Sequence, residues 1–106
     1  MKRLIPITFV LLHSFSAIAE DFIIYGAGAS DSCGTWVSDR KTEHRWHQAG
    51  QWALGYISGA GDQSPREFRK TDTEAIHIWL DNYCQNDPLA RFIDATRELL
   101  DVLEKE

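Results

Sequence analysis

Residues 71–84, with the sequence TDTEAIHIWLDNYC, decide the fold of this chain. The Thr71-x-x-Glu74 pattern at their start is a capping box, which marks the beginning of a helix. The apolar side chains that follow recur with the spacing of one helix face, and they are Ile76, Trp79, Leu80, Tyr83 and Cys84. The segment therefore predicts an amphipathic helix whose apolar face carries Cys84 into the core.

The rest of the chain predicts three further helices. Serine and aspartate at positions 30–32 provide capping side chains for a short helix over residues 32–40. A longer helix is predicted over residues 42–59, where a Gly-Ala-Gly sequence ends it. Asp87 and Pro88 fit the cap and the first position of a last helix. Its predicted buried stripe consists of Leu89, Phe92, Ile93, Thr96, Leu100 and Leu103. The predicted fold is all-α, a small antiparallel bundle of three to four helices.

A short apolar segment, residues 22–25, precedes these helices. It is followed by Gly26-Ala27-Gly28, which imitates the opening of a dinucleotide-binding fold. That motif needs a third glycine, where this chain has Asp31, and a second strand, which no later segment supplies. Residues 22–25 are therefore predicted to form an extended arm that packs on the helices.

Glycines and tryptophans indicate how the second predicted helix packs. Gly55 and Gly59 lie four residues apart, so we expect a notch against which a neighbouring helix packs closely. Trp46 and Trp52 lie six residues apart, which predicts that only one of them points inward. The other one either lines a groove or dimer interface, or covers a small core. The remaining tryptophans lie on apolar helix faces and are expected in the core; they are Trp36 and Trp79.

Residues 1–19 have the composition of a secretory signal peptide. Basic residues at positions 2 and 3 precede an apolar run over residues 4–12, and an Ala-Ile-Ala cleavage site ends the segment. The mature chain is then predicted to begin at Glu20 and to form a single helical domain over residues 20–106. An uncleaved anchor is the alternative, although the apolar run is shorter than the about 20 residues that span a bilayer. The leader predicts a periplasmic or secreted protein, with no membrane attachment after cleavage.

The two cysteines of the chain, Cys33 and Cys84, are expected to form a disulfide, because an exported protein enters an oxidising compartment. The bridge would close a loop of about fifty residues and stabilise the fold by about 4 kcal/mol through the loss of unfolded-chain entropy. A redox-active pair usually has C-x-x-C spacing, which this chain lacks. The pair is therefore predicted to be structural.

The charge of the mature chain limits its partners. Removing Lys2 and Arg3 from the eleven basic residues leaves nine, against sixteen acidic ones, for a net charge of −7. This charge repels phosphate backbones and anionic lipids, so neither nucleic acid nor a membrane is an expected partner. Another protein is expected instead, bound through the charged segment over residues 62–70. The predicted binding side chains in that segment are Asp62, Gln63, Arg66, Glu67, Arg69 and Lys70.

No catalytic or metal-binding set emerges from the sequence. His44 and His47 have a spacing that can bind a metal on a helix, but Glu43 or the distant His77 would have to supply a third ligand. His77 and Asp81 are read as an exposed pair on the third predicted helix. Because no nucleophile and base lie close together in the pattern, we expect no enzyme activity, no cofactor and no metal.

Parts of the chain resemble known families. The stretch WALGYISG over residues 52–59 resembles the G-Y-[IL]-S-G helix end of small periplasmic immunity proteins of type VI secretion amidase systems, the Tai/Rap group. The stretch WLDNYC over residues 79–84, with Pro88-Leu89 after it, is similar to the later helix, cysteine and N-P-L helix start of related secreted proteins. More distantly, the order of helices around one disulfide resembles the HdeA-type acid-stress chaperones.

These resemblances imply a non-enzymatic periplasmic domain that binds another protein. The first expectation is an immunity-type inhibitor of a cell-wall amidase effector. The alternative is an acid-stress chaperone that binds unfolded clients, because most carboxylates protonate below about pH 4 and the net charge then changes sign. A homodimer is left open.

Overall fold

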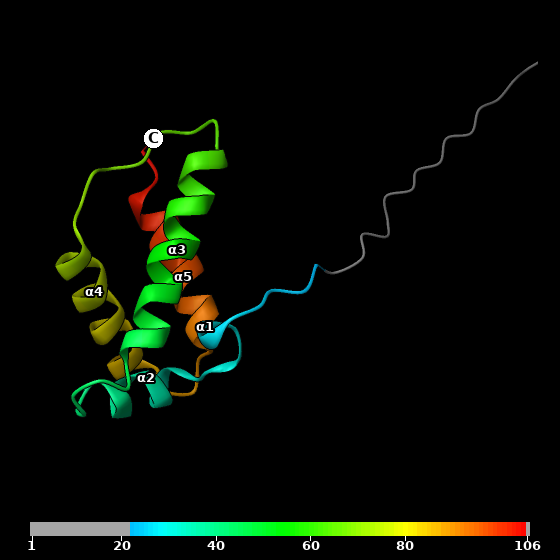
Figure 1. Ribbon diagram of the computed structural model, residues 1–106. Helices are drawn as coiled ribbons and strands as arrows, with labels where there is room; N and C mark the ends of the chain where they lie inside the picture. The colour runs from blue at the N-terminus through cyan, green and yellow to red at the C-terminus, as the bar shows by residue number, and fades with distance from the viewer. Residues whose placement is uncertain (1–21, 106) are drawn as a thin grey trace, which may run out of the picture.

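The computed structural model describes residues 22–105, and all of the regular structure in this range is helical (Figure 1). The helices are α1 (Ala27–Ser30), α2 (Cys33–Asp39), α3 (His47–Gln63), α4 (Thr73–Asn86) and α5 (Phe92–Leu103). The predicted all-α fold is confirmed, with α1 as an additional single turn. The predicted signal peptide over residues 1–19 lies outside the described residues.

The three long helices run up and down beside one another, and α2 lies across one end of the bundle (Figure 1). The chain rises through α3, returns through α4 and rises again through α5, so α4 is antiparallel to both of its neighbours (Figure 1). Apolar faces from all of these helices meet in one core. Its largest fully buried side chains are Trp36, Phe92, Leu80, Thr96, Cys33 and Cys84.

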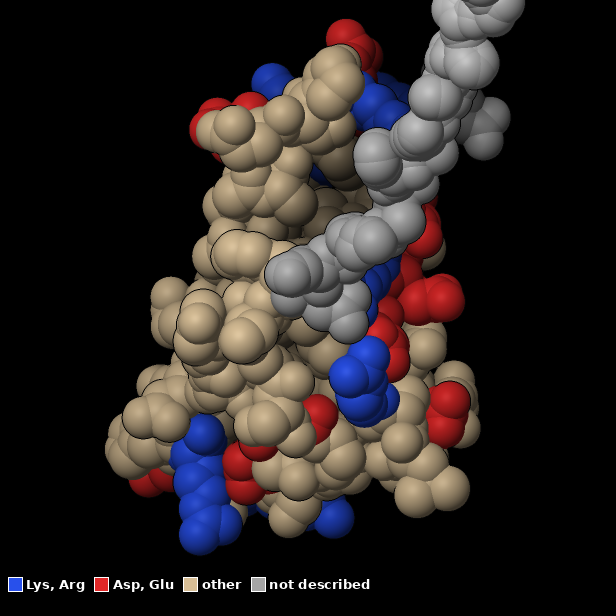
Figure 2. Space-filling view, turned by 90° about the vertical axis from the view of Figure 1, so that its right-hand side faces the viewer, with Lys and Arg blue, Asp and Glu red and all other residues tan. Residues whose placement is uncertain are grey.

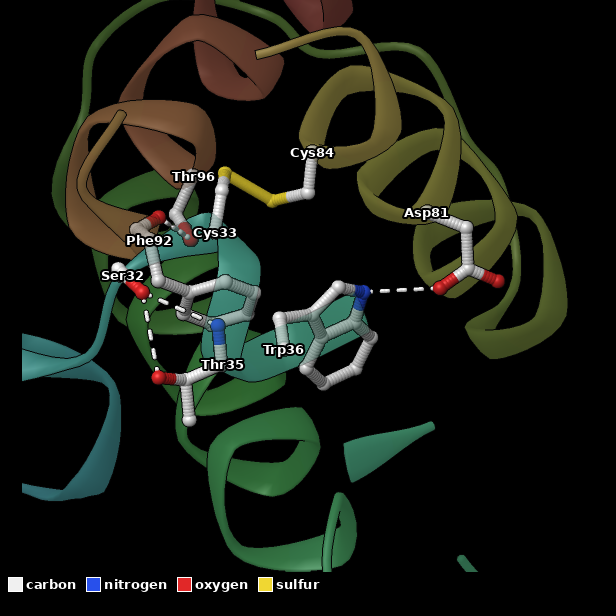
Figure 3. The surroundings of a disulfide bond; sticks show 8 residues. All are labelled: Ser32, Cys33, Thr35, Trp36, Asp81, Cys84, Phe92 and Thr96. Atoms are coloured by element: carbon white, nitrogen blue, oxygen red, sulfur yellow. Dashed lines mark hydrogen bonds between the residues drawn. A yellow bond between two sulfur atoms is a disulfide. The ribbon is translucent and has the colours of Figure 1, made fainter. Parts of the chain in front are cut away.

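A disulfide between Cys33 and Cys84 joins α2 to α4, as predicted. Both cysteines are fully buried, and Phe92 and Thr96 lie beside the bridge (Figure 3). The bridge therefore crosslinks the core, where solvent and redox partners do not reach it.

The helix over residues 71–84 matches its prediction except for the cap. The N-cap is Asp72, whose carboxylate accepts a hydrogen bond from the Ala75 backbone N–H at 2.9 Å, and not Thr71. The predicted helix over residues 42–59 is shifted, because the chain turns between Arg40 and Trp46 before α3 begins. At its other end α3 passes through Gly59 and Gly61, neither of which has positive φ, and it ends just before Pro65.

The predicted start of the last helix at Pro88 is wrong. Backbone N–H groups of α2 explain the later start at Phe92, because those of Cys33 and Gly34 donate to the carbonyls of Ala90 and Pro88. These bonds satisfy the first donors of α2 and hold residues 88–91 outside a helix. Leu89, predicted to be buried, is 93% exposed as a result.

Glycines near the start of the chain are the ones that permit close packing. A Cβ atom at Gly28 would lie 2.1 Å from the Trp52 ring, and one at Gly26, where φ is +114°, would lie 2.3 Å from it. The predicted notch at Gly55 and Gly59 is wrong, since a Cβ atom there would meet nothing within 4 Å. Both glycines face open space because the neighbours of α3 pack on its other sides.

Trp46 and Trp52 both pack against the core, contrary to the prediction that only one of them points inward. Trp46 lies edge-on to Trp36, with ring centroids 6.2 Å apart, whereas Trp52 fills the space over the glycines of residues 26–28. The two side chains leave α3 on different sides, and α2 and α1 each cover one of them.

The arm over residues 22–25 is attached at its base. The indole Nε1 of Trp52 donates to the carbonyl of Tyr25 at 2.8 Å, and Ile24 is half-buried. Phe22, Ile23 and Tyr25 nevertheless remain largely exposed, so the predicted packing of the arm on the helices holds only in part.

Candidate functional site

The predicted binding loop over residues 62–70 is divided by the structure. Asp62 and Gln63 belong to the last turn of α3. The later residues run antiparallel to the C-terminal segment, since the Arg69 N–H donates to the Leu103 carbonyl at 2.7 Å and the Lys105 N–H donates to Glu67 at 2.8 Å. This loop crosses the end of the bundle where α5 finishes (Figure 1).

Two of the predicted binding side chains are occupied by this pairing. Arg66 forms an ion pair with Glu104, and Glu67 lies 3.9 Å from Lys105. These charges face the C-terminal segment and neutralise one another there. They are therefore poor candidates for contact with a partner.

The remaining two, Arg69 and Lys70, lie at the edge of a hollow between α4 and α5. We call this hollow the α4–α5 groove; its volume is about 250 Å³. Arg69, Lys70 and Thr71 form its edge. Its floor and walls are apolar, and they are formed by Ala75, Ile76, Trp79, Leu99, Val102 and Leu103.

Trp79 is the central aromatic side chain of this surface. It is half-buried and stacks on Tyr83 one turn further along α4, with ring centroids 5.4 Å apart. It also lines a second shallow hollow, which contains Tyr83 and the amides of Asn82 and Asn86. The predicted core position of Trp79 is thus only partly right, because it lies at the rim of the α4–α5 contact, where one side of the ring meets solvent.

The groove is also distinguished by its charge. Of the nine basic side chains within residues 22–105, six form ion pairs with described carboxylates. The other three are Lys41, Arg69 and Lys70. Arg69 donates from its guanidinium to the Val102 carbonyl at 3.1 Å, a bond that fixes it at the groove while its charge stays uncompensated by any described carboxylate.

A second cluster surrounds Asp81, which the sequence had suggested to be exposed. Its carboxylate accepts hydrogen bonds from the Trp36 indole at 2.8 Å (Figure 3) and from two nitrogens of Arg40 at 2.9 and 2.8 Å. The Arg40 guanidinium also lies over the Trp46 ring, 4.5 Å from its centroid. The hydrogen bond to Asp81 raises the pKa of Arg40 further above its usual value. This cluster joins α2, α3 and α4 and is structural.

His77 is buried as well, so the predicted exposed pair with Asp81 is wrong. Only 5% of His77 is exposed, and its ring lies among Trp36, Trp46 and Gly50, whose carbonyl is 3.4 Å from Nε2. The helix faces the core on this side because Trp36 and Trp46 cover it, which the sequence of α4 alone does not reveal.

The three histidines within residues 22–105 do not converge on one site. His44 lies in the turn before α3, where its ring stacks edge-on against His47 with centroids 5.6 Å apart, and both are exposed. Within the described residues, no three His, Cys, Asp or Glu side chains gather as metal ligands. None of the helices in the described range is long and apolar enough to cross a membrane.

A further hollow, of about 550 Å³, lies between the arm and α5. Its two basic side chains, Arg91 and Arg97, share the single carboxylate of Asp94, which balances one of their two positive charges. The α4–α5 groove differs in that neither of its two basic side chains, Arg69 and Lys70, forms an ion pair with a described carboxylate. In the sequence, this groove was indicated by the pair Arg69-Lys70 directly before the predicted capping box.

Comparison with protein-family models, curated proteins and solved structures finds no match to this chain.

Proposed function

We propose that this chain is a non-enzymatic protein-binding domain of the periplasm that holds its partner at the α4–α5 groove. The size and lining of the groove carry this proposal. At about 250 Å³ it is smaller than the 300–1,000 Å³ typical of sites for whole small molecules. It suits a single large apolar side chain, the kind of anchor that dominates protein–protein interfaces.

The surroundings of the groove also support a protein partner. Trp79 and Val102, which is 42% exposed, present apolar surface to solvent beside it. The stacked Tyr83 and the neighbouring hollow extend this surface along α4. An interface centred on the groove would therefore bury an aromatic side chain and be surrounded by polar residues, as is usual for binding hot spots.

Our first proposal for the partner is a cell-wall amidase, which this protein inhibits as an immunity protein. The resemblance of residues 52–59 to the Tai/Rap group supports it, as does the predicted net charge of −7, which favours a partner with a basic surface. An inhibitor of this type needs no chemistry of its own, only a rigid surface that covers the entrance of an active site.

Photo-crosslinking in the periplasm tests this proposal. A crosslinking amino acid at Val102 in the groove should capture a peptidoglycan amidase, whereas the same group at the exposed Ser58 of α3 should not. The Ala75→Phe variant, which fills the groove, should abolish the capture and the inhibition of that amidase. Equal capture from both positions, or inhibition that survives the Ala75→Phe change, would count against the groove.

The Asp81 cluster favours one alternative, an acid-stress chaperone. The Asp81 carboxylate accepts three hydrogen bonds from Trp36 and Arg40, and Arg40 also covers the ring of Trp46 at the start of α3. Loss of the negative charge on Asp81 would weaken its bonds to Arg40 and to the Trp36 indole. The aromatic side chains between α2 and α3 would then become exposed, while the disulfide would keep α2 attached to α4.

Binding of an apolar dye separates this alternative from the first proposal. For a chaperone, dye binding and protection of clients should rise at about pH 3, where most carboxylates are protonated. The Asp81→Asn variant, which imitates the protonated carboxyl, should show part of the same dye binding at neutral pH. Unchanged dye binding in both experiments would reject the chaperone.

A further inference from the structure

Arg69 and Lys70, the two positive charges at the groove, differ from most basic side chains of this acidic chain in having no described ion pair. Six of the nine described Lys and Arg side chains form ion pairs with described carboxylates. Of the other three, Arg69 and Lys70 line the groove, and Lys41 does not. In a chain with an excess of acidic residues, two neighbouring unpaired cations favour the binding of a negatively charged group from a partner.

The position of the charge is fixed relative to the apolar floor. The bond from Arg69 to the Val102 carbonyl ties the cationic edge to the last turn of α5, whose Val102 and Leu103 line the same groove. Lys70 follows directly in the chain, and Thr71 leads into α4. An apolar group in the groove would thus have the side chains of Arg69 and Lys70 beside it.

We infer that the α4–α5 groove recognises a large apolar side chain of a partner protein that has an acidic residue next to it. The inference rests on the proposed function, because it requires the groove to be the binding site. The groove volume of about 250 Å³ favours one side chain over a whole lipid or metabolite. A free fatty acid carries the same pair of groups, and the test below separates it from a peptide.

Selection of short displayed peptides on the intact protein tests this inference. Enriched peptides should share a Phe, Trp, Leu or Met directly beside Asp or Glu. Lys70→Glu should weaken the affinity for a selected peptide by about ten-fold or more, through lost attraction and added repulsion. Lys41→Glu is the matched control, since Lys41 also has no described acidic partner and lies outside the groove. Because both residues are exposed, neither change should disturb the fold, and Lys70→Gln should give a smaller loss.

Two groove variants distinguish failure of this inference from failure of the proposed function. Ala75→Phe should abolish peptide binding, whereas Ser58→Phe, which adds the same ring to an exposed face of α3, should not. If Ala75→Phe abolishes binding but Lys70→Glu matches Lys41→Glu, or the peptides lack acidic residues, the inference is overturned and the binding site stands. If Ala75→Phe has no effect, both are overturned. Binding of dodecanoate but of no peptide would also overturn both.

Discussion

Asp81 is the side chain at which α2, α3 and α4 are joined. Its carboxylate accepts hydrogen bonds from the Trp36 indole and the Arg40 guanidinium, and Arg40 in turn covers the ring of Trp46. Both partners of the ion pair are about one quarter exposed, so water screens it only in part. An interaction of this kind costs more to break than an ion pair on the surface, because the groups left behind stay partly buried.

We therefore expect Asp81→Asn to lower the free energy of unfolding by about 1–3 kcal/mol. Urea denaturation followed by tryptophan fluorescence measures this loss, since Trp36 and Trp46 report on the same corner. Asp101→Asn serves as the control, because Asp101 is an exposed carboxylate on α5 without a described ion pair, and it should change stability very little. Equal losses in both variants would show that the Asp81 contacts contribute nothing special.

Two other aspartates should respond to pH in opposite ways. Burial, and to a lesser degree the charge of Asp39, raises the pKa of Asp31. The hydrogen bonds from Arg91 lower the pKa of Asp94. A raised carboxyl pKa means that ionisation destabilises the folded state at neutral pH, and a lowered pKa means that ionisation stabilises it.

At neutral pH, Asp31→Asn should therefore increase stability and Asp94→Asn should decrease it, each by less than about 1 kcal/mol because both carboxylates are partly exposed and water screens their charges. The gain from Asp31→Asn should fade as the pH falls through the raised pKa of Asp31. The loss from Asp94→Asn should be complete above the ordinary pKa of an aspartate, shrink below it, and disappear as the pH falls through the lowered pKa of Asp94. Urea denaturation across this pH range measures both, and effects of the same sign would contradict the assignment.

At the scale of the elements, the glycines of α3 differ in how much space their neighbours leave for a side chain. The helix carries no Lys, Arg, Asp or Glu from His47 to Gly61. Figure 2 shows a tan area without such residues on the left of the view, with basic and acidic side chains above it, below it and to its right. Gly55 and Gly59 lie on the open side of α3, whereas a Cβ atom at Gly50 would lie 3.1 Å from His77 Nε2 and from the Trp46 ring. A side chain larger than hydrogen therefore has room at Gly55 and Gly59 but meets close neighbours at Gly50.

Alanine substitutions in α3 should reflect this difference. Gly55→Ala and Gly59→Ala should each stabilise the protein by up to about 1 kcal/mol, because alanine favours the helix and meets no neighbour. Gly50→Ala should gain less or lose stability, because His77 or Trp46 must move. Thermal or urea unfolding of the three variants provides the comparison, and equal gains at all three positions would contradict the packing around Gly50.

At the scale of the whole molecule, the disulfide connects parts that are distant in the chain. Cys33 and Cys84 are 51 residues apart, and the loop between them contains α3 and most of α4. In a small domain the entropy lost by the unfolded chain is a large fraction of the total stability, which is typically 5–15 kcal/mol.

Replacing both cysteines by alanine should lower the free energy of unfolding by about 4 kcal/mol. Wild-type protein with its disulfide reduced should lose a similar amount, which controls for the lost side-chain packing. Denaturation of the two forms under oxidising and reducing conditions measures the change. A loss below about 1 kcal/mol would mean that the core holds α2 and α4 together without the bridge.

The sequence by itself determined the helices and the bridge. The α4 helix over Thr73–Asn86 was predictable because its capping signal and its apolar period agree. The pairing of Cys33 with Cys84 was predictable because the chain has no other cysteine. In the candidate site, Arg69 and Lys70 stood out in the sequence as charged loop residues, but Val102 and Leu99 on the opposite wall did not.

Tertiary structure alone decided what each helix face meets. Pro88 lies outside α5 because the N–H groups of α2 bind the carbonyls of residues 88 and 90. His77 and Asp81 are covered because α2 and the start of α3 lie over them, and the groove exists because the loop of residues 66–70 pairs with the end of α5. Local propensity and periodicity describe one segment at a time, whereas burial and hydrogen-bond pairing depend on which segments come into contact.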